Sequence, residues 1–188
     1  MAKIKYGISN LHYAVLTDEE SWTYGEVTHI PGTVKLAMSP EGDDAKFYAD
    51  NIAYFVTAVN NGFSGDLENA LLPEEFYIDA LGYEKDETTG MLMEVANAIS
   101  KPIALMFQFE TDEKARKVCL YKVNVGRPGM DHETKSETID PQTDTVPITV
   151  SAMKKGNKDY TKGTSSPESA NYDTFFDSVP VPGIAVGE

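Results

Sequence analysis

The residues that could do chemistry in this 188-residue sequence are few, and their spacing supports no metal site. The three histidines, His12, His29 and His132, are scattered, and a lone histidine in a strand pattern is usually an ordinary surface or half-buried side chain. Residues 131–133 read Asp-His-Glu, but neighbouring side chains of a strand point to opposite faces, and no second cluster completes a coordination sphere. We therefore expect no bound metal.

The possible nucleophiles lack the surroundings that would activate them. Residues 61–65 read Asn-Gly-Phe-Ser-Gly, but the spacing differs from that of a nucleophile elbow, and a tight turn into a strand is the simpler interpretation. Cys119 is the only cysteine and alternates with Tyr121 on an apolar face, as a small core residue does. Phosphate-loop, GxGxxG, HExxH and EF-hand patterns are absent from the sequence. We expect no catalytic residue, no cofactor and no enzymatic activity.

The elements that must position these residues follow a period of two. Large apolar residues alternate in 103–109, a polar turn follows at 110–114, and a second alternation runs from Cys119 to Val125, which together predict a β-hairpin. Further alternating or strand-like segments bring the expected number of strands to six to eight: 11–17, 34–38, 65–71 and 146–150. The sequence predicts a mainly β fold.

One helix is well signalled, over residues 73–81. Pro73 suits the first helical position, the acidic residues Glu74 and Glu75 complement the helix dipole, and Gly82 lies just beyond the end. A second short helix is expected over 170–178, where Phe175 and Phe176 could dock.

The segment 40–62 supports two interpretations. Turn residues at 39–44 lead into 47–55, which is rich in aromatic residues and apolar on both faces. It could be one strand buried on both sides, or an excursion whose aromatic residues pack against another subunit. The Lys-, Gly-, Ser- and Thr-rich residues 154–170 and the extended 179–183 suggest a flexible or extended arm over 153–188, after a domain that spans 1–152.

The charge is the most unusual global property. The chain carries 30 acidic and 16 basic residues, a net charge of −14, and the acidity is concentrated in the first two-thirds. Proteins that bind nucleic acid gain affinity through Lys and Arg, so the net charge argues against a nucleic-acid-binding protein. We expect no secretory signal and no membrane-spanning segment, and the single cysteine suits a reducing compartment.

Several short motifs, taken in order, resemble the major tail protein of bacteriophages with long non-contractile tails. They are Lys5-Tyr6-Gly7, Leu11-His12-Tyr13-Ala14, Pro31-Gly32, Ser39-Pro40-Glu41-Gly42-Asp43, Phe47-Tyr48-Ala49-Asp50-Asn51, Asn61-Gly62-Phe63-Ser64-Gly65, Leu72-Pro73-Glu74-Glu75-Phe76, Gly126-Arg127-Pro128 and Asp140-Pro141-Gln142-Thr143. The resemblance extends over about residues 3–152, and its specificity comes from order and spacing.

This resemblance implies a β-sandwich or barrel-like tail-tube fold with one flanking helix, a long extended loop and a terminal arm. Such subunits form hexameric rings that stack into a hollow tube, and the long loop, here 40–62, reaches the neighbouring ring. The resemblance, together with the aromatic content of the loop, nominates eight residues for inter-subunit contact: Asp43, Asp44, Phe47, Tyr48, Asp50, Asn51, Tyr54 and Phe55.

The partners implied are further copies of the chain, a tape measure protein and the proteins at the tube ends. The resemblance places the protein in the virion tail, assembled in the host cytoplasm, with no membrane contact. Genomic DNA would pass through the lumen without specific binding, and acidic residues on the wall would repel its phosphates. Alternatively, the acidity only keeps the subunit soluble before assembly.

Other function classes stay open from the residues alone. The chain could be the tube protein of a related contractile or secretion device, which shares the architecture. It could also be a β-sandwich module that recognises carbohydrate or protein, with the aromatic residues of 47–55 as a stacking platform.

Overall fold

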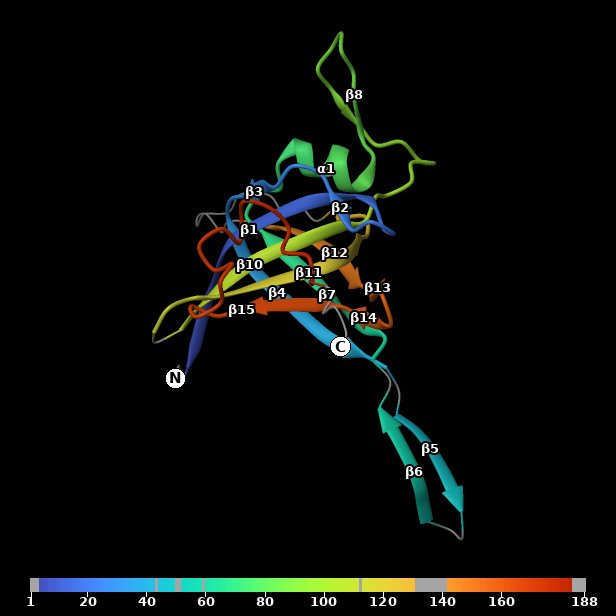
Figure 1. Ribbon diagram of the computed structural model, residues 1–188. Helices are drawn as coiled ribbons and strands as arrows, with labels where there is room; N and C mark the ends of the chain where they lie inside the picture. The colour runs from blue at the N-terminus through green and yellow to red at the C-terminus, as the bar shows by residue number, and fades with distance from the viewer. Residues whose placement is uncertain are drawn as a thin grey trace, which may run out of the picture.

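The fold is built around one large antiparallel sheet. The computed structural model describes residues 4–42, 44–49, 52–58, 60–111, 113–130 and 142–183. The strand order is β2-β1-β10-β11-β12-β7-β4, with β3 paired to β1 and β15 paired to β11 (Figure 1). The strands of this sheet are β1 (Lys5–Asp18), β2 (Thr23–Tyr24), β3 (Thr28–Ile30), β4 (Thr33–Glu41), β7 (Gly62–Asn69), β10 (Ile103–Thr111), β11 (Arg116–Val125), β12 (Asp144–Val150) and β15 (Lys162–Ser165). The expectation of a mainly β fold with one helix is confirmed.

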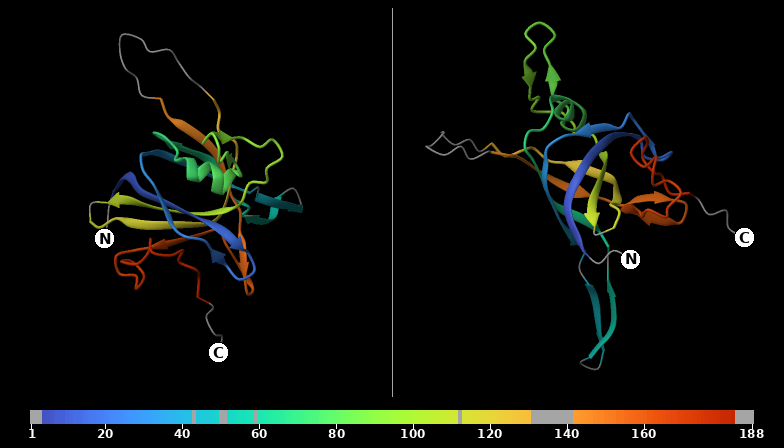
Figure 2. Two further views of the ribbon diagram at one scale, coloured as in Figure 1. Left: turned by 90° about the horizontal axis from the view of Figure 1, so that it is seen from above. Right: turned by 90° about the vertical axis from the view of Figure 1, so that its left-hand side faces the viewer.

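The sheet curves towards a barrel that its strands do not fully close. Seen end-on in the right-hand view of Figure 2, its strands surround a common interior. The two strands that complete the circuit, β1 and β4, lie beside each other, but within the described residues no hydrogen-bonded ladder joins them. One side of the barrel is therefore a seam between two strands.

The hairpin predicted over 103–125 is present as β10 and β11. Its register places Phe109 opposite Arg116 and Phe107 opposite Val118. The other edge of β11 is divided between two partners: β15 pairs with Lys117–Leu120, and β12 pairs with Val123–Val125. The sheet therefore forks along β11.

The two faces of β1, β10 and β11 bury different cores. Side chains such as Tyr13, Leu105 and Leu120 face the barrel interior. Their sequence neighbours Ala14 and Met106 face the opposite side, where they pack with Trp22 and Phe175. The alternation of strand side chains explains why these strands are apolar at nearly every position.

The helix α1 (Glu74–Leu81) covers one end of the barrel interior. It begins after Pro73 and ends at Gly82, whose φ of 74° is the left-handed conformation that glycine adopts at low cost. Phe76, Ala80 and Leu81 are its buried residues. The Tyr13 hydroxyl donates a 2.8 Å hydrogen bond to the Asp79 carboxylate, which ties α1 to β1.

Residues 153–183, which were expected to form a flexible or extended arm, instead complete the fold. They contribute a small hairpin of β13 (Met153–Lys155) and β14 (Lys158–Tyr160), then β15, then a chain of turns. Met153 is 0% exposed and Phe175 is 2% exposed, because both cover the outer face of the sheet. A few large side chains in a polar segment suffice to anchor it.

The second predicted helix, over 170–178, is absent, and turns occupy its place. Backbone hydrogen bonds from Tyr172 to Ser169 and from Asp177 to Thr174 span three residues, as in successive turns. Ser, Asn, Thr and Asp dominate this stretch, and their side chains favour local turns over helix. The predicted docking of Phe175 is confirmed.

Among the described residues, two projections extend from opposite ends of the body (Figures 1 and 2). One is the hairpin of β5 (Asp44–Ala49) and β6 (Ile52–Ala58), and the other contains β8 (Glu84–Lys85) and β9 (Leu92–Met93). The strands β5 and β6 pair with each other in a separate two-stranded sheet. The described residues 47–49 and 52–55 therefore belong to two paired strands that extend from the body, and not to one continuous strand inside it.

Candidate functional site

Five of the eight residues nominated for inter-subunit contact lie in the two strands of the projecting hairpin. Asp44, Phe47 and Tyr48 lie in β5, and Tyr54 and Phe55 lie in β6. In the backbone register, Phe47 is opposite Phe55, and Tyr48 is opposite Ala53. The remaining three, Asp43, Asp50 and Asn51, lie outside the described residues.

The groups considered for chemistry are in structural surroundings. Cys119 is fully buried, and burial raises the pKa of its thiol, which disfavours the reactive thiolate. Partial burial lowers the pKa of His12, and the nearby His29, whose ring centroid is 4.8 Å away, acts in the same direction. Ser64 lies within β7, opposite Thr149 of β12.

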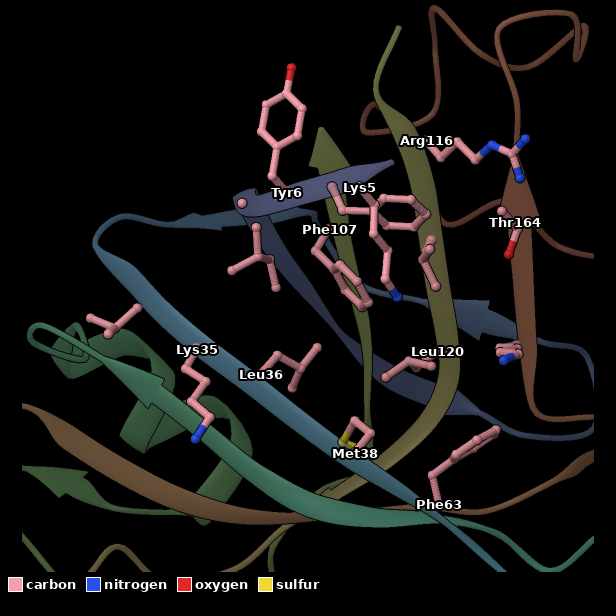
Figure 3. A pocket seen from close by; sticks show the side chains of 16 residues that line it. Lys5, Tyr6, Lys35, Leu36, Met38, Phe63, Phe107, Arg116, Leu120 and Thr164 are labelled. Carbon is pink, nitrogen blue, oxygen red and sulfur yellow. The ribbon is translucent and has the colours of Figure 1, made fainter. Parts of the chain in front are cut away.

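A groove of about 790 Å³ lies at one open side of the barrel (Figure 3). We call it the basic-rimmed groove. Residues from six strands line it: Lys5, Tyr6, Gly7 and Ile8 of β1, Val34, Lys35, Leu36 and Met38 of β4, Phe63 of β7, Phe107 and Phe109 of β10, Arg116, Val118 and Leu120 of β11, and Lys162 and Thr164 of β15. It lies where the seam between β1 and β4 leaves the interior open.

Strand register explains how one wall of the groove is assembled. Three rows of residues cross β10, β11 and β15 on the same face: Phe109 with Arg116, Phe107 with Val118 and Thr164, and Leu105 with Leu120 and Lys162. Side chains directly opposite each other on neighbouring strands share a face and touch. The apolar rows continue the barrel core, and the outermost residues reach solvent.

Half-buried apolar side chains form the interior of the groove. Leu36 and Met38 of β4 line the groove together with Phe107 and Phe109 of β10, and all four are partly buried side chains that pack against the barrel core. Val34, at the β4 end, is 51% exposed. The groove therefore presents apolar surface of the kind that a partner or ligand would bury.

Cations surround this apolar surface. The Lys5 ammonium lies 5.5 Å from the centre of the Phe109 ring, and the Lys162 ammonium lies 4.8 Å from the centre of the Phe63 ring. Arg116 stands at the outer end of β11, and Lys35 lines the edge on β4. Cations over aromatic faces are attracted by the ring quadrupole, so the interaction holds these charges over the opening.

The electrostatics of the groove contrast with those of the whole chain. None of its described lining residues is acidic, although the chain has a net charge of −14. Within the described part of the chain, Lys5, Arg116 and Lys162 form no ion pair. An apolar interior with unpaired cations at its rim suits a guest that is apolar or aromatic and carries negative charge.

Sequence reasoning missed the groove because its residues come from strands far apart in the chain. One local signal was available: in Arg116-Lys117-Val118-Cys119-Leu120 the arginine occupies the same strand face as Val118 and Leu120. A cation on an otherwise apolar face indicates that this face reaches solvent at that point. Its partners across the opening could not be identified without the fold.

Comparison with known proteins identifies no relative: neither a protein-family model nor a curated protein matches the chain. Among the described residues, no three His, Cys, Asp or Glu side chains gather as they would around a metal ion. The one described helix has eight residues, and no helix in the described part has the length and apolar character needed to span a membrane.

Proposed function

We propose that this protein is a structural subunit that polymerises into a tube of stacked hexameric rings, as the phage tail-tube subunits that its motifs resemble do. The observation that carries the proposal is the projecting hairpin of β5 and β6. Among the described residues its strands pair with no other strand, and it extends away from the body. A two-stranded hairpin alone in water is marginally stable at best, so it is expected to pack against another molecule.

The edge of the sheet supports the same proposal. β4 pairs with β7 along one side, and within the described residues no ladder occupies its other side. An unpaired strand edge is a site where a strand of another chain can pair. When the sheets of neighbouring subunits pair around a ring, no unpaired edge is left. Head-to-tail contacts that close by rotation give rings, and stacked rings give a tube.

Genomic DNA is the proposed passenger of the tube, without specific contacts, and the partners at its ends are the tape measure and tail-end proteins. The net charge of −14 is consistent with a wall that repels phosphate. The surroundings of Cys119 and His12, and the lack of a described metal cluster, offer no feature that favours catalysis.

Electron microscopy of the purified, concentrated chain tests this function. Hollow rings or tubes are the expected result. A variant in which residues 43–59 are replaced by a short glycine linker should stay folded by circular dichroism but lose tube growth. As a control, residues 86–91, at the tip of the other projection, are replaced by a linker of the same kind, and tubes should persist. A chain that stays monomeric at every concentration and binds glycans would instead indicate a recognition module.

A further inference from the structure

We propose that the basic-rimmed groove is the receptor for the β5–β6 hairpin of a second copy of this chain. This inference rests on the proposed function and deepens it, because it names the surface that receives the hairpin. The two surfaces match in chemistry: within the described residues the strands β5 and β6 pair with each other alone, and the cations Lys5, Arg116 and Lys162 at the rim of the groove form no ion pair.

The hairpin has the composition that the groove requires. Its strands include Phe47, Tyr48, Tyr54 and Phe55, and Asp43, Asp44 and Asp50 in and beside it outnumber the single Lys46. Described Ile52, the first residue of β6, is 62% exposed. The segment is thus apolar and aromatic with net negative charge, which is the chemistry that an apolar groove with a cationic rim favours.

The groove has the dimensions for such a guest. About 790 Å³ is within the range of roughly 300–1,000 Å³ of pockets that enclose a drug-sized molecule. It can therefore enclose several side chains at the end of a hairpin whose two strands are about 4.8 Å apart. Half-buried Leu36, Met38 and Phe107 would lose their remaining exposure to water on docking.

The geometry favours a second copy over the chain's own hairpin. Figure 1 and the right-hand view of Figure 2 show the hairpin extending away from the body. A hairpin of one copy in the groove of the next leaves the second hairpin free, so the contact is head-to-tail and can propagate. The contact would also weaken with salt, because exposed charges are screened beyond about 8 Å at physiological ionic strength.

Crosslinking at position 52 tests the contact directly. Ile52 is replaced by the photoreactive amino acid p-benzoylphenylalanine, and nitrogen-15-labelled chain is mixed with unlabelled chain so that crosslinks between copies are identified by mass. The expected crosslinks join position 52 to groove strands of another copy, such as the peptide with Phe107 or Leu36. The same replacement of Ile99, which is 86% exposed beyond β9, is the control and should not label the groove.

A charge swap provides the second arm. The groove variant Lys5→Glu/Lys162→Glu and the hairpin variant Asp44→Lys/Asp50→Lys should each weaken self-association at least tenfold, measured by sedimentation at low salt. The chain that carries all four substitutions should recover most of the self-association of the wild type. Lys158→Glu, a charge reversal at an exposed lysine of β14 outside the groove, should have little effect.

The outcomes separate this inference from the proposed function. If tubes form but the crosslinks map outside the groove and the charge swap does not restore self-association, the groove is not the receptor. The proposed tube function would still stand. Absence of both assembly and crosslinks would overturn both proposals. Groove crosslinks between copies without tubes would support the receptor alone. Binding of a dodecanoate probe that Lys5→Glu/Lys162→Glu abolishes, without crosslinks between copies, would assign the groove to a small amphipathic anion and overturn the inference.

Discussion

The two faces of the β10–β11 pair differ in how they are covered. The outer face, with Met106 and Cys119, is sealed by residues 153–183, and both side chains are fully buried. The inner face is sealed near Leu105 and Leu120 but opens towards Phe107 and Phe109, where the basic-rimmed groove lies. The same two strands thus form a finished core on one side and an incomplete one on the other.

The charges on the two faces differ in the same way. Lys117, on the outer face, is the one buried lysine among the described residues. Its ammonium donates a hydrogen bond to the Tyr172 carbonyl and lies 4.2 Å from the centre of the Tyr172 ring. On the inner face Lys5 and Arg116 stay exposed and form no ion pair with a described residue. A surface that leaves both apolar area and cations without partners is suited to binding, whereas the outer face only stabilises the fold.

The largest effect is expected on the sealed face. Phe175→Ala removes a ring that is 2% exposed, and large-to-small changes of this kind cost about 3–5 kcal/mol because a cavity is left. Equilibrium unfolding in urea measures the loss. A cost under about 1 kcal/mol would mean that residues 153–183 do not seal this face.

A smaller loss is expected where β15 joins β11. A Cβ at Gly163 would lie 2.2 Å from the hydroxyl of buried Tyr121, so Gly163→Ala must displace β15 or the ring. Overpacking costs about 1–3 kcal/mol. Gly129→Ala, where an added Cβ meets nothing within 4 Å, is the matched control in the same unfolding experiment. Equal stability of the two variants would show that β15 is held loosely.

The groove should tolerate truncation better than the sealed face. Phe107 is half-buried, so Phe107→Ala should cost about 1–2 kcal/mol, below the value for a fully buried ring. Its effect on self-association, followed by sedimentation, should exceed its effect on stability. If the unfolding cost equals that of Phe175→Ala, the inner face is as closed as the outer one and the contrast fails.

The smallest effect concerns pH on the sealed face. His12 stacks on Phe176, with ring centroids 4.7 Å apart, and burial together with His29 lowers its pKa in the fold. The unfolded state, with the ordinary pKa near 6.5, then binds more protons, so the contribution of His12 to stability is full above that pH and is lost as the pH falls. Melting temperatures between pH 7.5 and 5.5 should fall less in His12→Gln than in the wild type. If the melting temperatures of the two proteins fall equally with pH, the protonation of His12 does not contribute to the pH dependence of stability.

The parts of the fold that local sequence determines could be predicted. The alternation in β10 and β11, the Pro73 start and the Gly82 end of α1 each depend on neighbouring residues, and all are observed. The fork along β11 could not be predicted, since it depends on which distant strands compete for one edge. The polar composition of residues 154–170 led to the prediction of a flexible or extended arm over 153–188. Composition does not show that a few buried side chains, such as Met153 and Phe175, are enough to anchor this part of the chain.

The candidate site was predictable only in its hairpin half. The turn residues at 39–44 and the aromatic run 47–55 allowed an excursion as one of two interpretations, the other being a single buried strand, and the two-strand pairing of β5 with β6 was not anticipated. The groove half requires Lys5, Phe63 and Lys162 to meet across the barrel mouth, and nothing in the spacing of those residues indicates that they do.

The fork along β11 also has a consequence for the order of events during synthesis. The edge at Lys117–Leu120 receives its partner only when β15, over 40 residues later, has emerged from the ribosome. At translation rates of about 5–20 residues per second, that delay is roughly 2–10 seconds. During it the nascent sheet exposes an unpaired edge that carries Lys117, and a lysine on a strand edge opposes pairing with other chains. The emergence of β15 is thus the step that closes this part of the β11 edge.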